Sequence, residues 1–330
     1  MAHLLETMAY TGETPWHGLG NSLPANQSIE TWAKAAGLNW SIESSDVSYL
    51  ANNDKGQKLL MPFEQQKVLY RSDTLSPLSV VSQRYQEVQP RDILEFYRSL
   101  TEHYDFELET AGVLKGGRKL WALARTGQSK SLKGGDESNG YLLLATACDG
   151  TMATTAQFTS VRVVCNNTLT ISLADSKASA IKVPHSTEFD AKSVKQQLGL
   201  QINQWDDHCY EMKQLTQRKV TQSEAANYLD EVFNNLNHEI VLPERWRNSK
   251  ASHPNAKAMK HVLQMFNGQG RGATLDSAKD TAYGLLCSIT EYVDHERRAV
   301  SQDNRLDSAW FGAGAKLKQR GLEEALALAA

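Results

Sequence analysis

Residues 111–133, AGVLKGGRKLWALARTGQSKSLK, are the stretch on which our interpretation of the fold depends most. Its dipeptide Gly116-Gly117 is typical of a tight turn, because glycine adopts backbone angles that other residues avoid. Segments rich in β-forming residues lie on both sides of this turn, from Glu107 to Leu114 and from Lys119 to Arg125. The stretch therefore predicts an antiparallel β-hairpin.

The same stretch is strongly basic, with six cations and no Asp or Glu. These cations are Lys115, Arg118, Lys119, Arg125, Lys130 and Lys133. The whole chain, in contrast, has 35 Lys and Arg against 38 Asp and Glu, a formal net charge of −3. A local excess of positive charge in an acidic protein predicts contact with a polyanion such as a nucleic-acid backbone. The alternative is a Lys-rich hairpin that is simply solvated.

Trp121 lies among these cations. In strand geometry Lys119, Trp121 and Arg125 share one face, and the small apolar residues Leu120 and Ala122 share the other. Such a face is typical of a platform for single strands, in which the ring stacks on bases and the cations follow the phosphates. The alternative is that Trp121 is buried and the cations only surround it.

Further turn and cap signals define the fold class. Asp149-Gly150 is a strong turn signal, and it predicts a second hairpin made of Tyr141–Cys148 and Ala153–Val164. Ser28 is a suitable cap for a helix over 30–36, and Pro90 opens a helix over 92–104. Antiparallel hairpins with interspersed helices predict an α+β fold.

The chain becomes helical after residue 185. Apolar spacings of three and four predict one long helix from about 191 to 219, and further helices after Ser223, over 256–266 and from near Thr274. Asn166 or Asn167 suits a helix cap and predicts a short helix over 168–174. We therefore expect two domains, an α+β core with antiparallel hairpins over 1–185 and a helical domain over 186–330.

Composition limits the class of protein. Hydrophobic residues make up 41% of the 330 residues, which is ordinary for a globular protein. No apolar run is long enough to cross a membrane, and no secretory signal is visible. The four cysteines lie far apart without a C-x-x-C pair, which favours reduced thiols. We expect a cytoplasmic protein with no membrane contact, no metal and no cofactor.

Tests for catalytic motifs are mostly negative. The sequence has no phosphate-binding G-x-x-x-x-G-K-[ST] motif and no H-E-x-x-H motif. Glu291, Asp294 and His295 are the nearest approach to a catalytic group, since residues four apart on a helix are neighbours. They would hold a divalent metal in a nuclease, or form an ion-pair ladder with Arg298. We expect no enzymatic activity.

A second basic window covers residues 244–271, where Glu244 is the single acid and Trp246 is interleaved with the cations. The cations that we include in the candidate site are Arg245, Arg247, Lys250, Lys257, Lys260 and Arg271. Two basic windows, each with a tryptophan, favour a nucleic-acid-binding surface.

Four phrases of the sequence resemble a known family. They are TPWHGLG (14–20), TSVRVVCNNTL (159–169), ITEYVDHERR (289–298) and NRLDSAWFGAGAKLKQRGLEEAL (304–326). Together they are similar to the phage/plasmid-like protein family with domain of unknown function 932. The resemblance implies a place on phages, plasmids and integrated elements. A distant similarity to phage single-strand annealing proteins of the RecT and Redβ type would imply a hairpin-rich core with a helical tail.

Two of these phrases contain further candidate residues. Arg162 would contact a phosphate, or pair with a carboxylate from the helical half. In the segment Trp16-His17-Gly18, the tryptophan is expected to be buried and His17 to bond a backbone carbonyl, with a ligand role as the alternative.

The leading hypothesis is a single-stranded DNA-binding protein of a mobile element that promotes ATP-independent strand annealing in recombination. Its expected partners are single-stranded nucleic acid, further copies of the chain in a ring or filament, and host or phage recombination and replication proteins. The alternative is an interaction protein that acts on a host factor without DNA. A metal-dependent nuclease is the third hypothesis.

Overall fold

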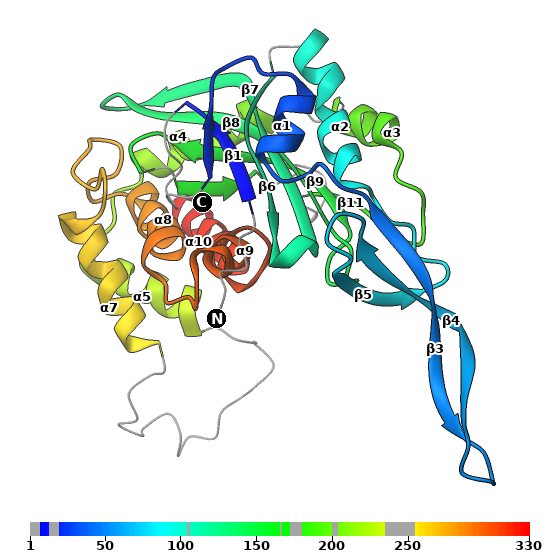
Figure 1. Cartoon of the computed structure of the whole chain (residues 1–330). Helices are drawn as coiled ribbons and strands as arrows, with labels where there is room; N and C mark the ends of the chain where they lie inside the picture. Colours follow the sequence, from blue (N-terminus) through cyan, green and yellow to red (C-terminus); the bar gives the residue numbers. More distant parts are fainter. Residues whose placement is uncertain are drawn as a thin grey trace, which may run out of the picture. The chain divides into compact units, whose positions relative to one another are not determined.

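A computed structural model describes most of the chain, and the described residues group into two compact units. The described ranges are 7–12, 20–103, 106–165, 167–171, 180–199, 204–234 and 255–330. The first unit consists of Met1–Gln128, Gly140–Thr159 and Ser172–Asn203, and the second of Ser129–Asn139, Ser160–Ile171 and Gln204–Ala330. The expected boundary at residue 185 lies within the first unit and stays a prediction. The α+β class is confirmed (Figure 1).

A twisted sheet forms the centre of the first unit. Its strands, in spatial order from β9 to β2, are β9 (Thr154–Arg162), β8 (Asp136–Ala147), β7 (Lys119–Leu132), β6 (Glu107–Leu114), β1 (Thr7–Thr11) and β2 (Asn21–Leu23), with β11 (Ile181–Val183) also paired to β9. Strands β7, β8 and β9 each run from one unit into the other along the chain. β6 and β7 are antiparallel, and Leu114 lies opposite Lys119.

Both predicted hairpins are confirmed, and their glycines explain the turns. Between β6 and β7 the turn η1 (Lys115–Gly117) has positive φ at Gly116 and Gly117, 68° and 103°. Between β8 and β9 Gly150 has φ 73°. Only glycine adopts such angles without a steric cost, so these turns are encoded locally.

The helices found in the described residues of the first unit are α1 (Ile29–Ala35), α2 (Pro90–His103) and α3 (Ala191–Gly199). The Ser28 hydroxyl accepts a hydrogen bond from the Thr31 amide at 3.2 Å, so the predicted cap is confirmed. α2 packs on the sheet: the Tyr97 hydroxyl lies 2.9 Å from the Ala122 carbonyl oxygen and 3.0 Å from that of Leu142. Burial of this apolar face stabilises the unit.

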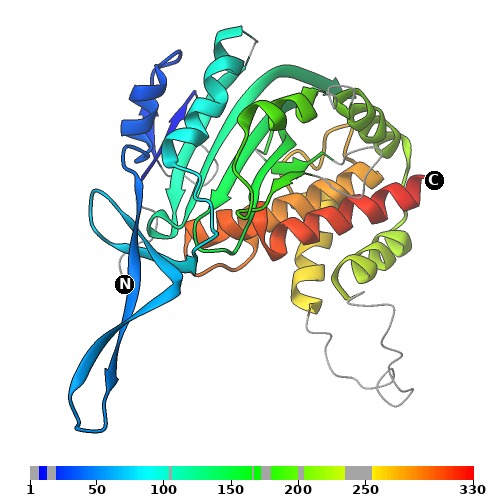
Figure 2. The same ribbon diagram turned by 90° about the vertical axis from the view of Figure 1, so that its right-hand side faces the viewer.

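A separate three-stranded sheet consists of β3 (Ile42–Asn52), β4 (Lys58–Arg71) and β5 (Pro77–Ser82), in the order β3-β4-β5. Figures 1 and 2 show β3 and β4 twisting around each other as they extend away from the rest of the first unit. The turn at their end is closed by Asn53, whose side-chain oxygen accepts from the amides of Lys55 and Gln57.

The second unit is mainly helical. Its elements are β10 (Asn167–Thr170), α4 (Gln204–Gln217), α5 (Gln222–Asn234), α7 (Ala256–Gln264), α8 (Ala282–Glu291), α9 (Gln302–Phe311) and α10 (Ala313–Ala329), with π-type turns η2 (Met265–Gln269) and η3 (Tyr292–Glu296). α8 is buried along its whole length and lies at the centre of the apolar core. No helix in the described ranges is long and apolar enough to cross a membrane.

Two local predictions need correction, and a third falls partly outside the described residues. The long helix over 191–219 is described as two helices, α3 and α4, with 200–203 outside the described residues. The helix expected near Thr274 begins after Thr281, whose hydroxyl accepts from the Gly284 amide. The short helix expected from Thr168 is wrong, because Asn167–Thr170 forms strand β10 beside β9. Pairing with a neighbouring strand overrides a weak cap signal.

Candidate functional site

The six cations of the basic hairpin do not form one cluster. Lys115 and Arg118 lie at the turn, and Arg125 lies opposite Glu107. Lys130 and Lys133 are exposed at the other end of β7 and belong to the second unit. The eleven residue steps from Lys119 to Lys130 extend about 36 Å along a strand. The hairpin therefore spreads its charge instead of concentrating it.

The stacking platform expected at Trp121 is not present, and that prediction is wrong for the described structure. Trp121 is 0% exposed and Lys119 is 7% exposed. The other face of β7 is buried too, with Leu120 at 1%. From Lys119 to Ala124 the side chains on both faces of β7 are buried, so a base cannot reach the ring.

Arg162 is also buried, and the prediction that it meets a phosphate is wrong. Its guanidinium forms a two-pronged ion pair with Asp136, with the Nε–Oδ1 distance 2.8 Å and the Nη2–Oδ2 distance 2.6 Å. It also donates to the backbone carbonyls of Arg271 and Gly272, at 3.3 and 3.2 Å. The Ser277 hydroxyl donates to the same Asp136 carboxylate at 2.5 Å. Arg162 therefore pairs with a carboxylate, as the alternative expected, but Asp136 belongs to strand β8 and not to the helical half that the alternative named.

A second buried ion pair joins Asp294 and Lys318, whose side chains are 0% and 5% exposed. The Lys318 ammonium lies 2.9 Å from Asp294 and 2.7 Å from the Thr168 hydroxyl. The Asp294 carboxylate also accepts from the Thr168 amide at 2.8 Å. Burial lowers the pKa of Lys318, and the adjacent Asp294 opposes that shift. Asp294 thus forms a buried ion pair within the second unit.

Glu291 and His295, which sequence spacing grouped with Asp294, bind other partners. The Glu291 carboxylate accepts from the Arg271 amide at 2.9 Å, and burial raises its pKa. The His295 Nε2 atom lies 2.9 Å from the Cys165 carbonyl oxygen, so it donates there. Among the described residues, no three His, Cys, Asp or Glu side chains lie close enough together to hold a metal ion. The structure does not assemble the trio into a catalytic group.

We call Asp136, Arg162, Asp294 and Lys318 the buried ionic centre of the second unit. Its bonds connect the segments 159–169, 289–298 and 304–326, three of the four phrases that carried the family resemblance. Sequence reasoning missed Asp136 and Lys318. One signal was available for Lys318, because it lies four residues after Gly314 and four before Leu322, on the buried face of α10.

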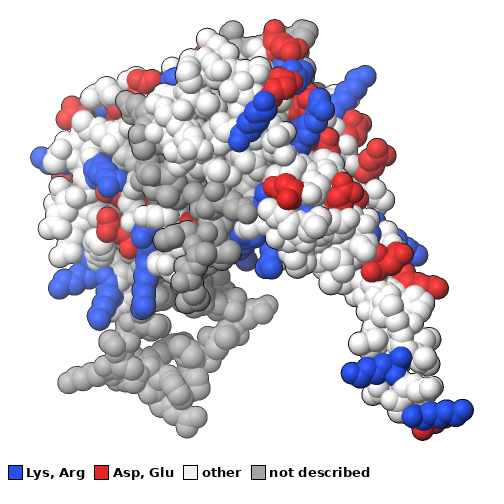
Figure 3. All heavy atoms as spheres, in the orientation of Figure 1, with Lys and Arg blue, Asp and Glu red and all other residues white. Residues whose placement is uncertain are grey.

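The remaining basic candidates are exposed residues of the second unit, or lie outside the described residues. Lys257 and Lys260 are exposed on α7, and Arg271 is half exposed in a loop, 3.9 Å from Glu291. Arg245, Arg247 and Lys250 are outside the described residues, as is the segment Trp16-His17-Gly18. Figure 3 shows cations and acids interspersed over the visible face, with no large single-sign patch.

Tyr210 on α4 is an exposed aromatic residue that sequence reasoning missed. Its side chain is 65% exposed, and Lys213 is exposed one turn further along the helix. Lys130 of β7 lies close enough to influence the neighbouring thiol of Cys209: burial raises the pKa of Cys209 to about 11, and Lys130 opposes this. Tyr210 falls outside the apolar stripe of α4, and this position predicts exposure. Lys213 therefore lies about one helical turn from Tyr210, and Lys130 lies near the adjacent residue Cys209.

The structure gives none of Lys130, Lys133 and Lys213 an ion pair with another described residue. Acids are present on the same helix, because Asp206 and Asp207 are exposed on the turn of α4 that precedes Tyr210. The positive side of the ring is therefore the side toward Lys213. We call Lys130, Lys133, Tyr210 and Lys213 the tyrosine–lysine surface.

A small cavity of about 30 Å³ in the second unit is lined by Arg162, His208 and Cys287, among others. His208 is buried, its Nδ1 atom has no hydrogen-bond partner among the described residues, and burial lowers its pKa to about 4. Burial raises the pKa of the Cys287 thiol to about 11, so it is protonated at neutral pH. A protonated thiol is a poor nucleophile, and the cavity is large enough for little more than a water molecule.

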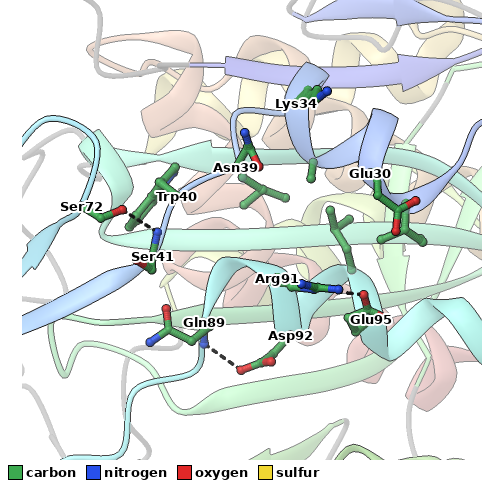
Figure 4. Close-up of a pocket in the computed structure, with 14 residues that line it drawn as sticks. Glu30, Lys34, Asn39, Trp40, Ser41, Ser72, Gln89, Arg91, Asp92 and Glu95 are labelled. Carbon is green, nitrogen blue, oxygen red and sulfur yellow. Dashed lines mark hydrogen bonds and ion pairs between the residues drawn. The ribbon is translucent and has the colours of Figure 1, made fainter.

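The first unit has a larger open groove of about 710 Å³ beside α1 and α2 (Figure 4). Its walls are formed partly by the apolar side chains of Ile29, Leu38 and Leu94. Its acids are already bonded: Glu95 pairs with Arg91 at 3.2 Å, and Asp92 accepts from the Gln89 amide at 3.0 Å. The groove is therefore large enough for a ligand, but Glu95 and Asp92 are already bonded and are not activated as an acid or a base.

Comparison with known proteins identifies a family that matches this chain. The family described as Domain of unknown function (DUF932) matches residues 77–310, well over half of the chain. No curated protein and no solved structure matches the chain. The similarity to phage single-strand annealing proteins therefore stays a prediction. The matched range contains the whole buried ionic centre except Lys318, and the chain belongs to the DUF932 family.

Proposed function

We propose that this protein binds single-stranded DNA of a phage or plasmid through the tyrosine–lysine surface and promotes strand annealing without ATP. The observation that carries the proposal is the exposed ring of Tyr210, 65% accessible, with Lys130 near the same turn of α4. An exposed ring accepts any base by stacking, and nearby exposed cations neutralise the phosphates on either side.

This proposal keeps single-strand binding, the function that the basic hairpin suggested. It places the contact on α4 instead of on β7. The ring on β7 is buried, whereas the ring on α4 is open to solvent. The acids Asp206 and Asp207 would repel phosphates, so the strand is expected to pass on the Lys213 side of Tyr210. The buried cations Arg162 and Lys318 do not take part, because both are already paired with carboxylates.

The mobile-element setting of the proposal comes from the family resemblance. A single stacking residue with a few cations covers only a few nucleotides, so annealing long strands requires several copies side by side. We therefore expect a ring or filament on the strand. Annealing needs no nucleotide hydrolysis when bound strands are held extended with their bases free to pair.

The test is a binding titration with a labelled single-stranded oligonucleotide, followed by an annealing assay with its complement. The variant Lys130→Ala/Lys133→Ala/Tyr210→Ala should bind at least about tenfold more weakly and anneal more slowly. A matched control, Leu75→Ala/Arg84→Ala/Arg91→Ala, removes two exposed cations and an exposed apolar side chain of the first unit. It should bind like the wild type.

Two results would overturn the proposal. One is a wild-type protein with no affinity for single strands at low salt. The other is a folded triple variant that binds as tightly as the wild type. A pull-down from host lysate with and without nuclease then tests the alternative of a host protein partner.

A further inference from the structure

The distal part of the β3–β4 ribbon, residues 48–63, is exposed although it is rich in large apolar side chains. Six of these side chains are between 38% and 70% exposed. They are Tyr49 51%, Leu50 64%, Leu59 45%, Leu60 70%, Met61 39% and Phe63 38%. None of them belongs to either hydrophobic core. We call residues 48–63 the distal arm.

The strand register divides these side chains between two faces. Tyr49 lies opposite Met61, and Ala51 lies opposite Leu59, so these four share one face. Phe63 follows Met61 by two residues on β4, next to the shift in register after Pro62, and we assign it to this face from strand alternation. The face of Tyr49, Ala51, Leu59, Met61 and Phe63 contains no charged residue. We call it the uncharged face of the distal arm.

The opposite face is different in character. Leu50 lies opposite Leu60 there, and Asn52 lies opposite Lys58. Lys58 and Glu64 alternate with Leu60 along β4, so this face mixes apolar and charged side chains. Figure 3 shows the arm as mostly uncharged along its length, with charges gathered at its end and nearer its base. A mixed face remains solvated, whereas an uncharged apolar face favours a dry contact.

An isolated two-stranded ribbon with an exposed apolar face is an unfavourable structure in water. Two strands alone are only marginally stable, and exposed apolar patches of several hundred Å² mark binding sites. β5 pairs with β4 only from Gln66 to Tyr70, so it does not cover the distal part. A nucleic acid is not the expected partner of this face, because the face has no cation.

We infer that the uncharged faces of two distal arms, one from each of two copies of this chain, pack against each other about a two-fold axis. In such a contact each copy presents the same surface, and a face without charges meets its own copy without like-charge repulsion. The inference goes beyond the proposed function and does not depend on nucleic acid.

The area is sufficient for a weak but specific dimer. The four large side chains of the uncharged face expose roughly 350 Å² on each arm, if about 200 Å² is taken for each fully exposed side chain. Because interfaces are a little over half apolar, the pair would bury on the order of 1,200 Å² in total. This value is at the lower limit for specific interfaces, so dissociation is expected in the micromolar range.

The experiment is sedimentation of the full-length protein over a micromolar concentration series without nucleic acid. The wild type should show a concentration-dependent dimer. Tyr49→Ser/Met61→Ser should raise the dissociation constant at least tenfold and leave the melting temperature unchanged, since neither side chain is in a core. The matched control is Leu50→Ser/Leu60→Ser, which alters the opposite face of the same arm and should dimerise like the wild type.

Each remaining outcome overturns the inference. A wild type that stays monomeric at tens of micromolar has no arm contact of this kind. Equal dimerisation of Tyr49→Ser/Met61→Ser and the wild type places the interface elsewhere. If the control variant is the one that loses the dimer, the wrong face was assigned. Because no strand is present, failure here leaves the single-strand binding test unaffected.

Discussion

The second unit contains two groups of charged residues of the same chemical types in opposite environments. In the buried ionic centre, Arg162 and Lys318 each touch a carboxylate and are about 5% exposed. On the tyrosine–lysine surface, Lys130 and Lys213 are exposed and have no ion pair with a described residue. The comparison teaches that the number of cations in a segment does not reveal which of them are available to a partner.

Deleting one charged side chain is expected to have different effects in the buried ionic centre and on the tyrosine–lysine surface. A buried ion whose partner is deleted remains in a medium of low polarity without compensation, and this is strongly destabilising. An exposed cation is solvated by water, so its deletion hardly affects folding. Substitutions in the buried ionic centre should therefore change stability, and substitutions on the tyrosine–lysine surface should change binding.

The largest effect is expected for Asp294→Ala. It leaves the Lys318 ammonium buried without its acid and should lower the free energy of unfolding by about 3–5 kcal/mol. Urea denaturation is the measurement. The exposed Asp276→Ala is the control, with a change within about 0.5 kcal/mol. A loss below about 1 kcal/mol for Asp294→Ala would show that Lys318 finds water or another partner.

His208 sharpens the same comparison through pH. Burial lowers its folded-state pKa to about 4, while an unfolded histidine titrates near 6.5. The unfolded chain therefore binds more protons between these values, so stability is complete above about pH 6.5 and falls as the pH decreases toward 4. Over this pH range the titration of His208 lowers the free energy of unfolding by roughly 3 kcal/mol. His208→Leu should lose less stability than the wild type between pH 7 and 4, and equal losses would contradict the prediction.

The next largest effect is expected for substitution of Tyr210. Tyr210→Ala should weaken single-strand binding about tenfold, since stacking on one base contributes about 1–3 kcal/mol. Tyr210→Phe keeps the ring and should bind like the wild type. Neither variant should change urea stability, because the side chain is 65% exposed. Equal weakening in both variants would mean that the hydroxyl, and not the ring, makes the contact.

The smallest effect is expected for Lys130→Ala/Lys133→Ala. Each phosphate contact on a single strand contributes about 0.7 to the slope of log affinity against log salt, so the slope should decrease by about 1.4. Stability should change by less than about 0.5 kcal/mol. Titrations at several salt concentrations provide the slope. If the variant still binds the strand and its slope of log affinity against log salt is unchanged, these lysines do not contact the phosphates.

Local signals predicted much of the fold. The hairpin turns at Gly116-Gly117 and Asp149-Gly150 and the cap at Ser28 are correct, because a turn or cap depends on a few adjacent residues. The arm formed by β3 and β4 was not among these predictions. Its outer half has apolar residues on both faces, which does not produce the alternation that identifies a half-buried strand.

The site was predicted less well, for a reason that particular residues make clear. The nucleic-acid hypothesis rested on two basic windows; Trp121 of the first window and the further candidate Arg162 are both buried. Asp136 is 26 residues before its partner Arg162, and Thr168 is 126 residues from its partner Asp294. No spacing rule covers such distances, whereas the exposure of Tyr210 follows from its position outside the apolar stripe of α4.

The sequence by itself determined the turns, most of the helices, the α+β class and the membership in a family, since these depend on neighbouring residues or on the order of motifs. Only the tertiary structure decided which charged and aromatic side chains are accessible. Accessibility depends on which distant segments cover a residue, and a cation is either buried against a carboxylate, as Lys318 is, or left in water, as Lys130 is.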